Sequence, residues 1–152
     1  MMTAATLFDP ADAERVRASF ARQTAMATLG IELASVEKGA VELRMPYAAP
    51  FTQQHGFIHA GIISTALDSA CGYAAFSTMS ADAAVLTVEF KVNLLAPAKG
   101  DRFVFRARVL KPGRTLTVCE AQAFAYEGDR AKLIASMTGT LMAVYGRDGI
   151  SH

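Results

Sequence analysis

The sequence predicts an α+β fold in which a long, curved antiparallel sheet wraps around one central buried helix, with an extra helix at the N-terminus. Residues 61–79 carry apolar side chains at helical intervals and a single charged residue. The segments that follow alternate apolar and polar residues and are separated by Pro and Gly. A helix that is apolar nearly all round must be covered on several faces. A sheet of about six strands curled around it covers it economically.

Length and charge limit the function classes. The 152 residues fit one domain, residues 1–152, which is long enough to bury a single core. Fifteen Lys and Arg residues against fourteen Asp and Glu residues give a net charge of +1. This balance lacks the one-signed field of a nucleic-acid binder, so we expect no nucleic-acid partner.

Apolar residues make up 52% of the chain, but no run of about 18 of them exists to span a bilayer. We therefore expect no membrane partner, and we expect the excess apolar surface to form subunit contacts. The N-terminal segment lacks a basic region followed by an apolar core, so we expect no secretory signal and a cytoplasmic location. Cys71 and Cys119 lie far apart without a metal-binding pattern, which predicts buried free thiols and no metal site.

The first predicted elements are a helix and a hairpin. Asp9-Pro10 is typical of a helix start and Gly30 of a helix end, which predicts one amphipathic helix between them. Residues 31–46 alternate around a turn at Lys38–Gly39, which predicts a β-hairpin. Its expected inward-facing residues are Ile31, Leu33, Val36, Val41, Leu43 and Met45.

A loop with two prolines leads from the hairpin to the central helix at residues 61–79. After this helix, Val, Thr, Phe and Leu alternate with polar residues, as is typical of half-buried strands. Long antiparallel strands are predicted at residues 84–98, 101–113, 114–128 and 130–146, with turns at Pro97, Lys99–Gly100, Pro112–Gly113 and Glu127–Asp129.

His59 and Asp68 are the candidate site residues of this region. A charge in a helix of Ala, Ile and Leu is costly unless it has a partner. A rise of about 1.5 Å per residue separates the two backbones by roughly 13 Å along the helix axis, too far for one small site. A two-fold axis, however, brings the helix start of one subunit beside Asp68 of the other. The expected site is therefore composite and requires a homodimer.

The pattern alone leaves two interpretations of each residue open. Asp68 is either a functional carboxylate or a structural acceptor for free helix amides or for the hydroxyls of Ser64 and Ser69. His59 is either a capping or packed histidine, or it marks a helix start at which Gly61 lets a substrate carbonyl approach the free amides. The second interpretation of His59 requires a catalytic partner, and Asp68 of the other subunit is a candidate for that role.

The run QQHGFIHAG at residues 53–61, followed by ALD at residues 66–68, resembles the hotdog-fold acyl-CoA thioesterases of the phenylacetate-pathway (PaaI) type. The pattern of that family is Asn, a Gly three residues on, His-Gly-Gly, and an Asp nine residues after the His. The similarity extends over nearly all of the chain and includes residues 29–31, 88–97 and 113–115. It implies a hotdog fold, no cofactor beyond the coenzyme A of the substrate, and a homodimer that pairs into a homotetramer.

The resemblance also implies roles for single residues. Asp68 matches the family's catalytic carboxylate, which acts either as a nucleophile or as a general base on water. The Gly61 amide matches the group that polarises the thioester carbonyl, and His59 matches the His that helps to hold the site. Thr87 falls where relatives carry a Ser or Thr that orients the attacking water.

Other matches depart from the family pattern. Gln53 stands where the family has Asn, so the amide is kept on a longer side chain, and Ala60 replaces the first glycine, which narrows the approach to the carbonyl. His55 is an extra residue that either lines the pocket or faces solvent. The turn at Gly113 and Arg114 corresponds to one near the coenzyme A phosphates in relatives; Arg114 either contacts phosphate oxygens or is a solvated hairpin residue.

These features predict a thioesterase that hydrolyses a small, medium-chain or aromatic acyl-CoA to free acid and coenzyme A. A Ser-His-Asp mechanism is disfavoured because Ser64 lies inside the helix, without a turn that exposes it. The alternatives are a noncatalytic acyl-CoA-binding protein and, less favoured, an acyl-thioester hydratase or dehydratase, whose usual motif is absent. Residues that suit either an acyl pocket or the plain core are Phe57, Ile58, Tyr73, Phe76 and Met79.

Overall fold

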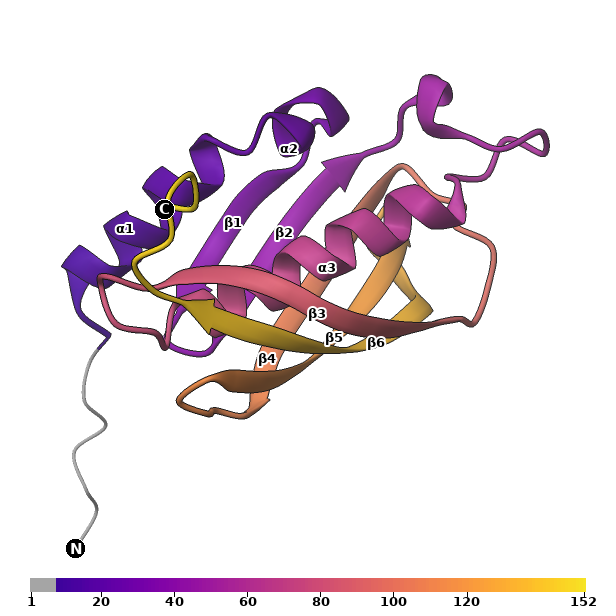
Figure 1. The fold of residues 1–152 in the computed structure, drawn as a ribbon. Helices are drawn as coiled ribbons and strands as arrows, with labels where there is room; N and C mark the ends of the chain where they lie inside the picture. Colours follow the sequence, from indigo (N-terminus) through magenta and orange to yellow (C-terminus); the bar gives the residue numbers. More distant parts are fainter. Residues whose placement is uncertain (1–7) are drawn as a thin grey trace, which may run out of the picture.

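The computed structural model describes residues 8–152 and shows a six-stranded antiparallel sheet around one long helix (Figure 1). In chain order the elements are α1 (Pro10–Ala21), α2 (Thr24–Leu29), β1 (Glu32–Glu37), β2 (Ala40–Pro46), the 3-10 helix η1 (Ala49–Phe51), α3 (Ala60–Phe76), β3 (Ala84–Leu94), β4 (Arg102–Lys111), β5 (Leu116–Glu127) and β6 (Arg130–Val144). The spatial strand order is β1-β2-β4-β5-β6-β3, so β1 and β3 are the edges. The predicted hotdog fold is confirmed. Residues 1–7, on which the prediction of no secretory signal partly rests, lie outside the described residues.

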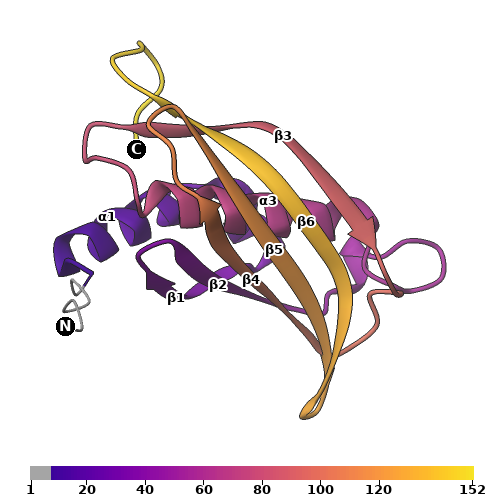
Figure 2. The ribbon, with the colours of Figure 1, turned by 90° about the horizontal axis from the view of Figure 1, so that it is seen from below.

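Helix α3 lies against the concave side of the sheet, with β4, β5 and β6 curving past it (Figure 2). Its core side chains, among them Ile63, Leu67 and Phe76, have almost no exposed surface. Small side chains on the facing side of β5 leave room for the helix, because Cys119 and alternate alanines are buried there. Both cysteines are buried free thiols, as predicted.

The N-terminal helical segment is two helices, so the prediction of one continuous helix was wrong. Its predicted ends are confirmed: the Asp9 carboxylate accepts the Ala11 amide at 2.8 Å, and Gly30 ends α2 with φ of 68°. The break falls at Gln23, whose backbone is extended and therefore cannot continue the helix. The Gln23 side chain instead reaches α3, where its Oε1 accepts the Ser69 hydroxyl at 3.3 Å.

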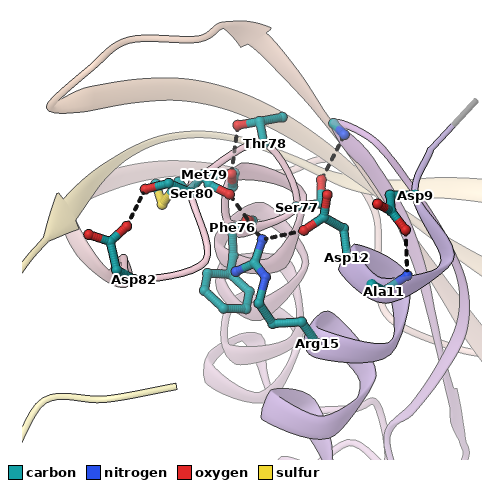
Figure 3. A network of polar contacts seen from close by, with 12 residues as sticks. Asp9, Ala11, Asp12, Arg15, Phe76, Ser77, Thr78, Met79, Ser80 and Asp82 are labelled. Carbon is teal, nitrogen blue, oxygen red and sulfur yellow. Dashed lines mark hydrogen bonds and ion pairs between the residues drawn. The ribbon is translucent and has the colours of Figure 1, made fainter. Parts of the chain in front are cut away.

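Helix α3 ends at Phe76, three residues before the predicted end at Met79. Arg15 of α1 supports this end: its Nη2 donates to the carbonyls of Phe76 at 3.3 Å and Met79 at 3.0 Å (Figure 3). The guanidinium also lies 4.2 Å from the centre of the Phe76 ring. A cation at a helix C-terminus satisfies free carbonyls and is favoured by the helix dipole. This contact fixes α1 against the end of the central helix.

The predicted hairpin and the four later strands are confirmed. Strands β1 and β2 pair across a turn in which Gly39 has φ of 80°, and Val41, Leu43 and Met45 of β2 are buried. Strand β3 joins the sheet only through β6, which leaves its other edge unpaired in the described chain.

No helix in residues 8–152 is long and apolar enough to cross a membrane.

Candidate active site

Asp68 lies in the middle of α3 and is held by Thr87 of the edge strand β3. The Thr87 hydroxyl donates to the Asp68 carboxylate at 2.8 Å. Partial burial raises the pKa of Asp68 above its ordinary value, and the Thr87 hydrogen bond opposes this by lowering it. The carboxylate is therefore a stronger base than a solvated Asp, yet it keeps a donor that stabilises its charged form.

The structure does not show the hydrogen-bond partners that the structural interpretation assigned to the Asp68 carboxylate. The Ser64 hydroxyl donates to the Ala60 carbonyl at 2.8 Å, and the Ser69 hydroxyl donates to Gln23. Neither serine bonds the carboxylate. Asp68 lies two turns into the helix, beyond the free amides of the first turn. The side chain that does bond it, Thr87, is the residue that the family resemblance placed beside the attacking water.

A small pocket of about 90 Å³ lies beside the carboxylate. Most of the side chains around it are polar, and they come from α3, β3, the α1–α2 junction and the segment after β6; the lining residues are Gln23, Asp68, Ser69, Gly72, Tyr73, Val85, Thr87 and His152. His152 is fixed there by a 2.6 Å hydrogen bond between its Nδ1 and the Ser19 hydroxyl and by its ring, 4.6 Å from that of Phe76. Sequence reasoning missed Gln23 and His152, because no spacing or motif links these positions to Asp68.

The start of α3 forms a second group of candidate residues. His59 is the N-cap, and its Nδ1 accepts the Gly61 amide at 2.8 Å. Its carbonyl accepts the amides of Ile62 and Ile63. The capping interpretation of His59 is thus what the structure shows, and the Gly61 amide expected to polarise a thioester is engaged by that ring. The Ala60 amide has no partner within residues 8–152, which leaves it free to bind a carbonyl oxygen.

Gln53 and His55 lie in a closed turn just before this helix start. The Gln53 amide donates to the Phe57 carbonyl at 2.8 Å, and the Gly56 amide donates back to Gln53 at 3.0 Å, with Gly56 at φ of 81°. The Gln53 side-chain oxygen accepts the His55 amide, so its NH2 group is the part left for a ligand. His55 is exposed at the tip of the turn, in agreement with a solvent-facing histidine.

A cavity of about 520 Å³ adjoins the helix start and is lined mainly by apolar side chains from the loop before α3, the end of β3 and β6. Its lining residues are Gln53, Phe57, Ile58, Ala60, Ile63, Leu94, Leu95, Ala96, Pro97, Ala98 and Ile134. Of the residues proposed for an acyl pocket, only Phe57 and Ile58 line this cavity. Tyr73 and Phe76 pack edge-to-face in the core, with ring centres 6.2 Å apart.

Arg114 and Gly113 lie in a different part of the chain. They line a hollow of about 350 Å³ with Met79 and other residues just beyond the end of α3. A Cβ at Gly113 would lie 1.9 Å from the Leu116 carbonyl oxygen, so the turn accepts only glycine. The 17 residues of α3 span about 25 Å, which separates this turn from the helix start by nearly the whole helix.

Within one chain the structure therefore joins Asp68 to Thr87, and it places Gln53 and Ala60 at the large cavity, with His59 and Gly61 next to Ala60 at the helix start, but it does not join the two groups. A carboxylate base with an adjacent water-sized pocket can activate water, and a free helix amide can polarise a carbonyl. No three His, Cys, Asp or Glu side chains in residues 8–152 are grouped to hold a metal ion.

Comparisons with known proteins agree with this chemistry. Residues 55–132 match the family model of the thioesterase superfamily. The crystal structure of a thioesterase family protein from Silicibacter pomeroyi is 63% identical, with a TM-score of 0.88, and the match covers 89% of this chain and 99% of that chain. A relative from Saccharolobus solfataricus that carries the name esterase is 35% identical over 94 residues, which are 62% of this chain and 66% of that protein. The 1,4-dihydroxy-2-naphthoyl-CoA hydrolase of Listeria monocytogenes is 27% identical over 93 residues, 61% of this chain and 76% of that protein.

Proposed function

The chain belongs to the thioesterase superfamily and is a thioester hydrolase, and from this premise we propose that it is an acyl-CoA thioesterase acting as a homodimer. The observation that carries the proposal is the partly buried Asp68 carboxylate, hydrogen-bonded by Thr87 beside a water-sized pocket. Coenzyme A as the leaving group is supported by the relative from Listeria monocytogenes, whose name states a CoA thioester as its substrate.

In the proposed reaction Asp68 is a general base. It takes a proton from a water molecule in the 90 Å³ pocket, and the oxygen of that water attacks the thioester carbonyl carbon. A helix amide stabilises the charge that develops on the carbonyl oxygen. The carbon–sulfur bond then breaks, and the departing sulfur takes the proton to give coenzyme A and a free acid. The raised pKa of Asp68 and the adjacent space for water favour this route over direct attack by the carboxylate.

The unpaired edge of β3 supports the homodimer. Leu86, Val88 and Phe90 on this strand are 42%, 53% and 43% exposed, which is unusual for large apolar side chains on a free edge. Antiparallel pairing of two β3 strands about a two-fold axis would satisfy the edge and cover these side chains. It would also set the Thr87 end of one strand against the Leu94 end of the other. Asp68 of one subunit would then face the helix start and large cavity of its partner, as a composite site requires.

The proposal is tested by assaying the wild type and Asp68→Asn against a panel of short, medium-chain and aromatic acyl-CoAs, with free coenzyme A as the readout. We expect turnover of at least one acyl-CoA by the wild type and a loss of about 100-fold or more in the variant, as for removal of a general base. Asp129→Asn, an exposed acid in the turn between β5 and β6, is the matched control. Both variants must keep the wild-type oligomeric state.

The alternative of a noncatalytic acyl-CoA-binding protein gives a different result. In that case the wild type and Asp68→Asn bind acyl-CoA equally, and neither releases coenzyme A. The departures at Gln53 and Ala60 are the features that would favour this alternative, because they change the helix start where the carbonyl binds. An acyl-thioester hydratase would consume an unsaturated acyl-CoA without releasing any thiol.

A further inference from the structure

The large cavity beside α3 has a closed floor and an open rim. Leu94 and Leu95 at its mouth are 55% and 54% exposed, whereas Ile58, Ile63 and Ile134 on its inner side have almost no exposed surface. A volume of about 520 Å³ is within the range of small-molecule sites. The cavity is therefore open at the exposed end of β3 and closed on its inner side, toward β6.

The cavity is also fixed by backbone hydrogen bonds. The Ile134 carbonyl accepts the amides of Leu95 at 2.8 Å and Ala96 at 3.2 Å, which ties the loop after β3 to β6. The Ile58 amide donates to the Ala98 carbonyl at 3.0 Å, which ties the same loop to the segment before α3. These hydrogen bonds hold three walls of the cavity together when no ligand is bound. Binding therefore costs little free energy for ordering the walls.

The polar groups of the cavity lie together, and none is charged. They are the Gln53 side chain and the free Ala60 amide at the start of α3, and the other lining side chains are apolar. An occupant that fits this distribution is uncharged and apolar along its length and carries one hydrogen-bond acceptor at the helix-start end. A carboxylate at the floor would be buried without a hydrogen-bond partner, so an acyl group that ends in a charge would bind weakly there.

We infer that this cavity is the acyl compartment, that the substrate class is acyl-CoA with an uncharged, apolar acyl group, and that Ile134 at the floor determines the longest acyl group that fits. This inference rests on the proposed thioesterase function. The thioester carbonyl lies at the helix start, the acyl group extends inward toward Ile134, and coenzyme A leaves through the mouth. The polar pocket beside Asp68, at about 90 Å³, is too small for such a group and is left to water.

The test measures affinity along a series of saturated acyl-CoAs by calorimetry, using Asp68→Asn so that hydrolysis does not consume the ligand. We expect affinity to rise about fourfold for each added methylene until the chain reaches the floor, and then to fall. In the same background, Ile134→Ala moves the optimum to longer chains and Ile134→Phe moves it to shorter ones. Ile134→Val, with a smaller shift toward longer chains, serves if the larger changes prevent folding. Leu141→Ala is the control, because Leu141 is equally buried on β6 but does not line the cavity.

An acyl group of equal length that ends in a carboxylate is expected to bind at least tenfold more weakly than the methyl-ended one. The inference is overturned if affinity does not depend on chain length, or if no Ile134 variant moves the optimum. Failure of the proposed function is a separate result: the wild type then releases no coenzyme A from any member of the series, whatever its affinities.

Discussion

The hydrogen bond from Thr87 to Asp68 makes a specific prediction about the pH dependence of hydrolysis. Thr87→Val keeps the shape of the side chain and removes the hydroxyl that donates to the carboxylate at 2.8 Å. Because that bond lowers the pKa of Asp68, its loss raises the pKa further. A base that must be ionised to act is then protonated at a higher pH, so the acid limb of the rate profile moves upward in pH.

The size of the effect follows from the strength of this bond. A hydrogen bond to a charged group contributes about 1.5 kcal/mol at the lower end of its range, which suits a donor on an exposed strand. This corresponds to about a tenfold smaller ionised fraction on the acid side of the profile. We therefore expect kcat/KM of Thr87→Val to be about tenfold below wild type at low pH and to approach the wild-type value at high pH.

The assay is kcat/KM from the mildly acidic to the mildly basic range, with released coenzyme A quantified after quenching. Thr87→Ser, which keeps the hydroxyl, is the matched control and should follow the wild-type profile. The reasoning is refuted if Thr87→Val shows the wild-type profile, or if its loss is the same at every pH. A uniform loss would mean that Thr87 acts on water or substrate and not through the ionisation of Asp68.

Other predictions concern the subunit boundary and stability. Gly61→Leu should be inactive because a Cβ at Gly61 lies 3.1 Å from His59 Nδ1, so the larger side chain displaces the capping ring and distorts the helix start. Equal mixing of this variant with the inactive Asp68→Asn should restore about a quarter of wild-type activity after subunit exchange, because half of the dimers then carry one intact composite site. A site within one chain restores none. Asp68→Asn should unfold at the same or a higher temperature than wild type at neutral pH, since a carboxyl pKa that folding raises destabilises the fold once the pH exceeds the ordinary carboxyl pKa. This gain should vanish below about pH 4, where both states of the wild type are protonated. Arg15→Met should lower the free energy of unfolding by about 1 kcal/mol in urea titrations without changing kcat. The loss is modest because Nε and Nη1 of Arg15 are buried without partners, which offsets part of what its two carbonyl contacts contribute.

The parts of the fold that were predictable from sequence are those set by local periodicity. Helix α3 and strands β3 to β6 repeat apolar residues at the spacing of their own element, so each segment carries its own signal. The break at Gln23 has no such signal, because a contact with Ser69, which lies 46 residues away, accompanies it. The end of α3 likewise lies beside Arg15 of another helix, although Ser77 and Thr78 continue a helix-compatible sequence.

The candidate site also has residues that could be predicted from the sequence and others that could not. Asp68, His59 and Thr87 could be predicted as site residues because the spacing of a family motif places them, and the structure shows the contact between Thr87 and the Asp68 carboxylate. The spacing could not show that the His59 ring takes the Gly61 amide, because this depends on a side-chain rotamer at the helix cap. Nor could it show His152, which reaches the Asp68 pocket only because the segment after β6 folds back along α1.

The proposed dimer acts on the pKa of Asp68 in two opposite directions. Covering the β3 edge removes water from Thr87 and Asp68, which strengthens the burial that already raises the pKa. The same pairing brings the N-terminal end of the partner's α3 toward the carboxylate, and the positive end of a helix dipole lowers a carboxyl pKa. The partner's helix and the Thr87 hydrogen bond both favour the ionised carboxylate and oppose the effect of burial. The proposed dimer would thus complete the site geometrically and would also act on the ionisation of Asp68, on which general-base catalysis depends.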